Sequence, residues 1–155
     1  MNISCWGDLL INIINEPKGL EYFRLLDYLF ITSDKFSLTM RDGLKKGWNV
    51  HDILESLEDY LIEIVSGEDF AFNNYCDGKV YVYKLTRESM DILKSNSNRL
   101  YEWQHPYLPE DLSFFDKDWN TKLITVAHEK INGLVISDES DLIYIVNNIG
   151  IELYL

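Results

Sequence analysis

The spacing of apolar side chains changes period along this chain, and each period predicts a different kind of element. Residues 18–31 carry apolar side chains at helical spacing with charged residues on the opposite face, which predicts an amphipathic helix. Residues 35–41 alternate apolar and polar side chains, as a half-buried strand does. Residues 79–85 are apolar or aromatic at both parities, so we expect a strand that is covered on both faces.

Less regular segments add further helices. Residues 4–15 are predicted to form a helix with Ser4 as its N-cap. The apolar residues at helical spacing are Trp6, Leu9, Leu10, Ile13 and Ile14. We expect Asn49 to cap a short helix, while residues 60–65 fit a continuation of that helix and an extended strand equally well. Thr86 is expected to cap another short helix, and Ser137 to open the last one.

Two more strands are predicted at residues 112–116 and 121–128, and Asn132-Gly133 is a strong hairpin signal after them. These strands should share one sheet with the strand at residues 79–85. We therefore expect a single α+β domain over residues 1–155, in which an antiparallel sheet carries N-terminal helices and one C-terminal helix.

Composition limits the possible partners. The chain of 155 residues has 46% hydrophobic residues, enough for one core, and its net charge is −12 from 26 acids against 14 bases. Nucleic acid and anionic membranes would be repelled, so a basic protein partner is favoured; the alternative is that the acids only keep the domain soluble. Residues 1–16 show no signal peptide, and Cys5 and Cys76 have no metal-ligand spacing, which favours a cytoplasmic protein with free thiols.

No complete catalytic motif is present. Cys76 with His51 or His105 would make a thiol–imidazole pair, but nothing in the sequence brings them together, and a buried thiol is preferred. Ser113 lacks the glycines of a nucleophile elbow. The aromatic and proline run at residues 103–109 is interpreted as a rigid connector whose aromatic rings pack on the sheet, with a peptide-binding surface as the alternative. We expect no catalytic residue and no cofactor.

His128-Glu129 resembles half of a zinc-protease helix motif, which needs a second histidine one turn later, where this chain has Asn132. On strand parity His128 shares a face with Ile124 and Val126. The sequence therefore predicts a hydrogen-bonded histidine at the edge of the core and no metal site.

The segment 100–129 carries a longer pattern, which reads L-Y-E-W-Q-H-P-Y-L-P-E-D-L-S-F-F and ends with A-H-E. It resembles a family of small uncharacterised bacterial proteins that read L-P-E-D-L-C-F, then a hydrophobic strand, then S-H-E or A-H-E. The matching positions are Pro109, Glu110, Asp111, Leu112, Phe114, His128 and Glu129. Ser113 stands where the family has cysteine. The resemblance covers residues 79–129, and the family offers no activity that could be carried over to this chain; some relatives are similar to immunity proteins encoded beside secreted toxins.

The charge pattern is the sharper signal. Between Lys46 and Lys79 there is no lysine or arginine, while eight acids are interleaved with aromatic residues. Acids around aromatic anchors suit a surface that steers and holds a basic partner. The predicted partner-binding residues are Asp52, Glu55, Glu58, Asp59, Tyr60, Glu63, Glu68, Asp69 and Phe70. We expect the acids on one side of the fold, with Tyr60 or Phe70 partly exposed among them.

The sequence thus favours a non-catalytic, acidic, cytoplasmic immunity protein that neutralises a basic toxin domain, such as a nuclease, by direct binding. The alternative is a structural or regulatory bacterial domain that has no toxin partner. The sequence leaves the oligomeric state open.

Overall fold

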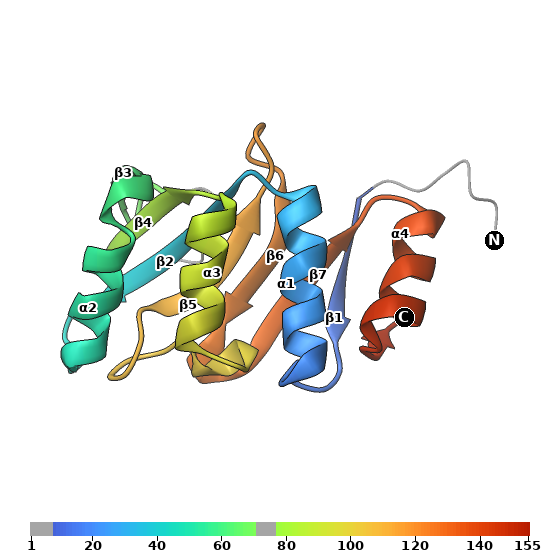
Figure 1. Ribbon diagram of the computed structural model, residues 1–155, viewed down its shortest axis with the longest axis horizontal. Coiled ribbons are helices and arrows are strands. Elements are labelled where there is room, and N and C mark those ends of the chain that lie inside the picture. The colour runs from blue at the N-terminus through green and yellow to red at the C-terminus, as the bar shows by residue number, and fades with distance from the viewer. Residues whose placement is uncertain (1–7, 71–76) are drawn as a thin grey trace.

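An antiparallel sheet runs through the molecule, and the helices cover one of its faces (Figure 1). The computed structural model describes residues 8–70 and 77–155. In these residues the strands are β1 (Leu9–Ile13), β2 (Lys35–Arg41), β3 (Leu61–Ser66), β4 (Gly78–Lys84), β5 (Glu110–Phe115), β6 (Thr121–Val126), β7 (Ile131–Ile136) and β8 (Leu153–Tyr154). The helices are α1 (Leu20–Thr32), α2 (Trp48–Ser56), α3 (Arg87–Asn96) and α4 (Glu139–Tyr144), which continues as the π-helix η5 (Ile145–Ile149). Short 3-10 turns are η2 (Glu58–Tyr60), η3 (Leu100–Glu102) and η4 (Ala127–Glu129).

The strand order in the described residues is β3-β4-β2-β5-β6-β7-β1-β8, and all neighbouring pairs are antiparallel. The predicted α+β class is therefore confirmed. The three segments expected to share a sheet do so as β4, β5 and β6. None of the helices in the described residues has the length and apolar content to span a membrane.

The main core lies between the helices and the sheet. Helix α1 buries Tyr22, Leu25, Leu26 and Leu29 on one stripe, which packs against sheet residues such as Phe114. Leu20, the first residue of the helix, is exposed, and the buried stripe begins at Tyr22.

A smaller cluster covers the opposite face at one end of the sheet. Val80 and Val82 of β4 pack there with Phe115 and Phe70, whereas the alternate residue Tyr83 belongs to the main core. The prediction that this strand is covered on both faces is confirmed, although β4 lies second from the sheet edge.

The predicted N-terminal helix is wrong. Residues 9–13 form β1, paired with β7 and β8, while Ser4 and Trp6 lie outside the described residues. The short apolar run fits both periods, and the unpaired edge of β7 decides between them. Leu10 lies over Gly133, where any β-carbon would come within 2.6 Å of its side chain.

The expected hairpin at Asn132-Gly133 is also wrong, since both residues lie inside β7. The chain turns instead at η4, which ends with Lys130 in the left-handed conformation at φ 55°. Asn132 is buried, and its amide bonds the backbone of Ile13, accepting from the nitrogen at 2.7 Å and donating to the oxygen at 3.0 Å. A residue typical of turns serves here to link β7 to β1.

The helix starts follow local chemistry in one case and depart from it in two. Thr86 caps α3 in a capping box with Ser89, as predicted. Helix α2 begins after Gly47 without a side-chain cap, so the expected cap at Asn49 is wrong. Asp138, not Ser137, caps α4 by accepting a bond from the Asp141 nitrogen.

The predicted parity of β6 is wrong as well. Leu123 and Thr125 are buried against the main core, while Ile124 and Val126 are half-buried on the face that carries no helices. The strand ends at Val126, so His128 belongs to the turn η4. The buried parity of this strand is Thr121, Leu123 and Thr125, and it is less apolar than the parity of Ile124 and Val126, so alternation alone predicts the wrong face.

Candidate functional site

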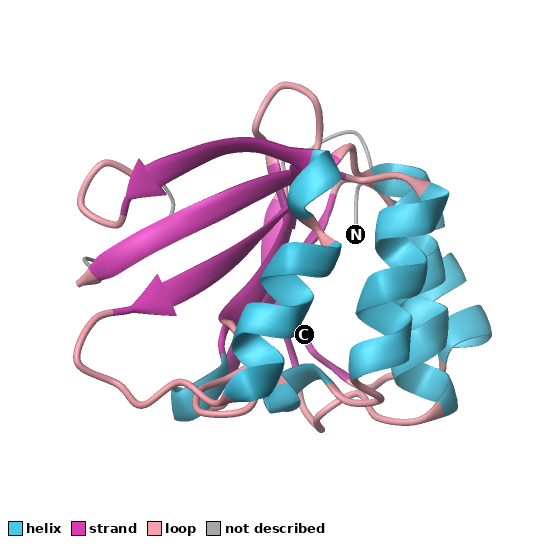
Figure 2. Cartoon of the chain, turned by 60° about the vertical axis from the view of Figure 1, so that its left-hand side comes forward, coloured by secondary structure: helices cyan, strands magenta, loops and turns pink. Residues whose placement is uncertain are grey.

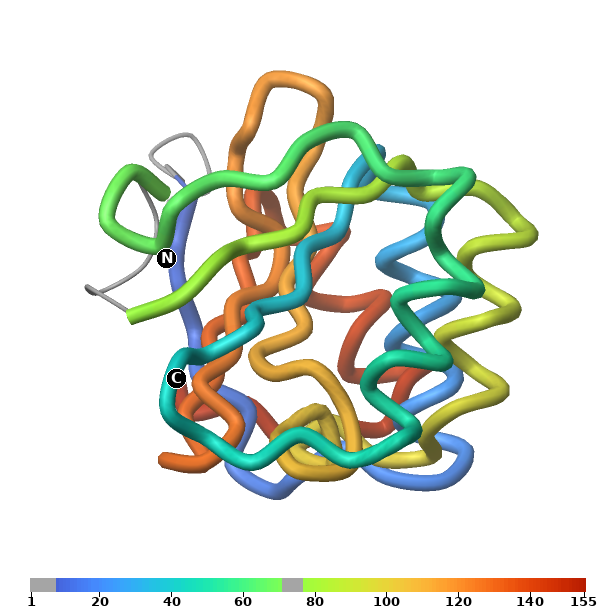
Figure 3. Tube along the Cα trace, turned by 90° about the vertical axis from the view of Figure 1, so that its left-hand side faces the viewer, coloured from blue at the N-terminus to red at the C-terminus, as the bar shows by residue number. Residues whose placement is uncertain are grey.

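Helix α2, the turn η2 and strand β3 lie together at one end of the molecule, and Figure 3 shows this end facing the viewer. Helix α2 buries Val50 and Ile53 and turns Asp52 and Glu55 outward. The ambiguous segment at residues 60–65 is extended and supplies the outermost strand of the sheet. We call the exposed acids of this region the acidic edge: Asp52, Glu55, Glu58, Asp59, Glu63, Glu68 and Asp69.

The negative charge of the acidic edge is not offset by ion pairs within the described residues. In the part of the chain that the structure describes, none of these seven carboxylates forms an ion pair. The arginines and lysines that do form ion pairs are Arg41, Lys94 and Arg99, all with acids outside this edge. Repulsion within the edge is therefore left for solvent ions or a partner to offset.

Of the two predicted aromatic anchors, Tyr60 is partly exposed, which meets the expectation that one of them would be, and Phe70 is buried. Phe70 is only 6% exposed, with its ring centroid 5.6 Å from that of Phe115, so its assignment to the partner surface is wrong. Tyr60 is half-buried and packs against the main core. Trp48, at the start of α2, is 88% exposed and lies one helical turn before Asp52. Its spacing from Asp52 on the polar face of the helix is the signal that identifies it in the sequence.

A second cluster of charged residues lies at the C-terminal end of β2, where Arg41 is the last residue of the strand. Arg41 donates from Nε to Oε2 of Glu110 at 2.6 Å and from Nη2 to Oδ2 of Asp111 at 2.5 Å. The two carboxyl side chains are 2% and 5% exposed. Asp111 adopts φ 60°, which aspartate tolerates better than most residues, and its Oδ1 accepts from the Ala127 nitrogen. Burial raises the pKa of Asp111, against the opposing effects of this amide and Arg41.

His128 completes this cluster. Its side chain is 40% exposed, and Nδ1 lies 3.4 Å from Oε2 of Glu110, so the histidine is not the core residue that parity predicted. Glu110, Asp111 and His128 each offer one ligand atom within 4.8 Å of the others. Arg41 already occupies the space between the two carboxylates, however, and a divalent cation would have to displace it. The geometry is that of an ion-pair network between Arg41 of β2 and the two carboxylates of β5, with the His128 ring of η4 beside it.

The predicted thiol–imidazole pair stays a prediction, because Cys5 and Cys76 both lie outside the described residues. His51 is exposed on α2, and His105 accepts from the Arg41 backbone nitrogen through Nε2 at 3.1 Å. Burial lowers the pKa of His105. Ser113 is buried, and its hydroxyl donates to the Asp111 backbone oxygen.

The aromatic and proline run packs only in part. Trp103 is fully buried and donates from Nε1 to the Tyr22 hydroxyl at 2.9 Å, as expected of a connector held on the core. Tyr107 is exposed, so the expectation that it packs on the sheet is wrong.

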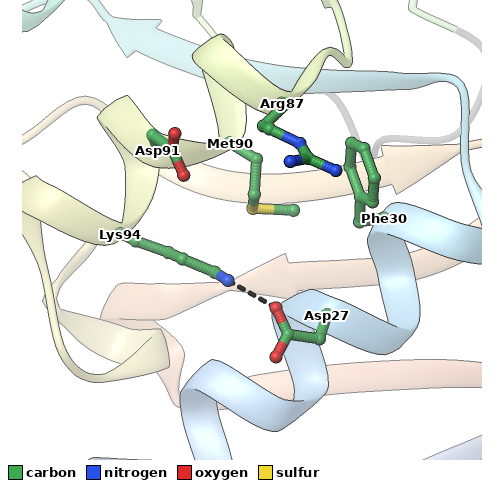
Figure 4. A pocket seen from close by; sticks show the side chains of 6 residues that line it. All are labelled: Asp27, Phe30, Arg87, Met90, Asp91 and Lys94. Carbon is green, nitrogen blue, oxygen red and sulfur yellow. Dashed lines mark hydrogen bonds and ion pairs between the residues drawn. The ribbon is translucent and has the colours of Figure 1, made fainter.

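A groove of about 300 Å³ lies between α1 and α3 (Figure 4). It carries charges of both signs, and Lys94 pairs with Asp27 across it. Phe30 and Met90 supply apolar surface. Because the charges are balanced within the groove, it does not extend the acidic edge.

Comparison of the chain with protein-family models, with curated proteins and with solved structures finds no match. The functional argument therefore rests on the geometry of the acidic edge.

Proposed function

We propose that the acidic edge is a binding surface for a basic protein domain. The carrying observation is that seven exposed carboxylates without ion-pair partners gather around one edge of the sheet beside the exposed Trp48. Clustered carboxylates make the local electrostatic potential strongly negative, which speeds the encounter with a cationic partner. An exposed tryptophan supplies the apolar anchor that such contacts need for a slow dissociation.

The most specific form of this proposal is an immunity protein that neutralises a basic toxin domain. A nuclease is one such partner, because its phosphate-binding surface is cationic and an acidic plug competes with nucleic acid for it. The resemblance of residues 79–129 to a family with immunity-like members supports this form. The alternative, a structural or regulatory domain without a toxin, keeps the binding surface and changes only its partner.

The test is a pair of triple charge reversals with the same change in net charge. The first replaces acids of the edge (Glu58→Lys, Asp59→Lys, Glu63→Lys), and the control replaces acids of the C-terminal region (Glu139→Lys, Asp141→Lys, Glu152→Lys). Association with basic domains encoded beside this gene is measured by stopped-flow at low and at physiological salt. We expect the first variant to associate about tenfold more slowly at low salt. Equal rates for both variants would reject the acidic edge.

The substitution Trp48→Ala tests whether the tryptophan slows dissociation of the partner, separately from the effect of the acids on the association rate. The side chain is 88% exposed, so its removal should leave the melting temperature unchanged. We expect the association rate to stay the same and the dissociation rate to rise by about tenfold or more, as for a hot-spot residue. Tyr107→Ala, at an exposed aromatic residue outside α2, is the control. An unchanged dissociation rate for Trp48→Ala would remove the tryptophan from the surface.

A further inference from the structure

Among the residues that the structure describes, strand β3 ends the sheet, and its outer edge has backbone groups that pair with no other strand. The Gly67 nitrogen donates to the Gly78 oxygen in register with the β3–β4 pairing. Since bonded and non-bonded pairs alternate in an antiparallel ladder, Val65 bonds to β4, while the backbone groups of Ile64 and the N–H of Ser66 point outward. The Ser66 oxygen is already used, because it accepts from the Asp69 nitrogen at 3.0 Å. In the described part of the chain β3 pairs with β4 alone, and Ile64 makes no backbone hydrogen bond to a turn or loop.

This edge has few of the devices that normally protect an edge strand. Such strands usually carry lysine, proline or inward-pointing charges that block pairing with another chain. The sequence of β3 is L-I-E-I-V-S, with one acid and a single irregularity between Leu61 and Glu63. Ile62 and Ile64 are 49% and 47% exposed. Figure 2 shows the strands at this end of the sheet running out beyond the helices.

An open groove of about 540 Å³ borders the same edge. The sheet side of the groove is formed by Ile64 and Ser66 of β3 together with Gly78 and Lys79 of β4. Three acidic residues also line it: Asp42, Glu68 and Asp77. A strand added to β3 would present alternate side chains to this groove. A lysine or arginine there would meet an excess of negative charge, which Lys79 offsets only in part.

We propose that β3 accepts an extended, basic segment of the partner as an additional antiparallel or parallel strand of the sheet. The inference rests on the proposed function and adds the mode of binding: backbone pairing along β3, with basic side chains directed to the groove and to the acidic edge. A second copy of this chain is a poor occupant. Pairing β3 with itself would bring two acidic edges together, including Glu63 of each copy.

The probe is a capped peptide of alternating lysine and valine. Its binding to the 15N-labelled protein is followed by NMR, with hydrogen exchange measured at the Ile64 and Ser66 amides. We expect shifts centred on β3 and protection of both amides. The control peptide has the same charge but is methylated on every backbone nitrogen, and we expect it to bind about tenfold more weakly because it cannot donate backbone hydrogen bonds.

A matched pair of variants gives a second reading. Ile64→Pro removes an outward N–H without touching the bonds to β4, which an edge strand tolerates, whereas Ile64→Thr keeps the N–H. Only the proline variant should lose peptide affinity, again by about tenfold, with the fold of each variant checked by circular dichroism. Sedimentation equilibrium of the free protein should show a monomer.

The outcomes separate the two proposals. Equal binding of the plain and methylated peptides would mean attraction by charge alone, which overturns strand addition and leaves the acidic edge intact. A dimer that Ile64→Pro dissociates would also overturn it, because the occupant would be a second copy. If the plain peptide protects β3 equally in the wild type and in the Glu58, Asp59 and Glu63 charge-reversed variant, strand addition stands and the proposed function fails.

Discussion

At the scale of single residues, Arg41 pairs with two carboxylates that lie far from it in the chain, and we expect this pairing to control stability. Glu110 and Asp111 are almost fully buried, and both depend on the same guanidinium. A buried pair contributes little relative to apolar residues of the same shape, but removal of one member leaves an uncompensated charge. Loss of Arg41 alone should therefore destabilise the protein more than loss of the arginine together with both carboxylates.

Arg41→Met should lower the free energy of unfolding by about 3–5 kcal/mol, because two carboxylates then remain buried without their cation. The measurement is urea unfolding at neutral pH. The same substitution in a Glu110→Gln, Asp111→Asn background, which leaves no buried charge, should cost much less. A loss of equal size in both backgrounds would assign the effect to packing of the arginine stem.

At the scale of elements, the pairing of β1 with β7 is built on a large residue facing a small one. Leu10 fills the space over Gly133, and the Asn132 amide ties the end of β7 to Ile13. These contacts join segments separated by more than a hundred positions. They explain why the N-terminal apolar run is a strand.

Gly133→Val should destabilise the protein by about 1–3 kcal/mol, because the new side chain overlaps Leu10. In a Leu10→Ala background the same valine fills vacant space and suits a strand, so it should be neutral or stabilising. The four free energies of unfolding form a double-mutant cycle. Additive effects would show that residues 9–13 do not pack beside β7.

At the scale of the whole molecule, phenol groups are distributed through the core. Tyr22 and Tyr28 lie on α1 and Tyr83 lies on β4, and burial raises the pKa of each. The folded protein therefore favours the neutral phenols. Stability contributed in this way is fully present below the ordinary tyrosine pKa of about 10 and is lost as the pH rises above it, when the unfolded chain ionises first.

We expect the free energy of unfolding to fall steeply above about pH 10, with tyrosine ionisation and loss of tertiary structure in one transition. Absorbance of the tyrosinate and near-ultraviolet circular dichroism follow the two events. Tyr83→Phe should reduce the pH dependence, while Tyr154→Phe, at an exposed residue, should not change it. Tyrosines that titrate near pH 10 in a protein that stays folded would contradict the burial.

The sequence by itself determined the elements whose local pattern admits one solution. Residues 18–31 and 35–41 have a clear helical and a clear alternating period, and Thr86 a capping chemistry, and all three appear where predicted. The absence of lysine and arginine between residues 46 and 79 is likewise a property of the sequence. Many acids therefore fall on consecutive elements, and for this reason the sequence alone predicts an acidic surface at this end of the fold.

Tertiary structure decided the features that depend on contacts between residues distant in the chain. The run at residues 9–13 fits both periods, and only the free edge of β7 makes it a strand. Phe70 and Trp48 are both aromatic residues among acids, yet Phe70 fills the smaller apolar cluster on the face without helices and Trp48 faces solvent. Arg41 meets Glu110 across a sheet pairing that no local spacing encodes. Local periodicity records which side chains are apolar, whereas burial and charge pairing are set by neighbours distant in the chain.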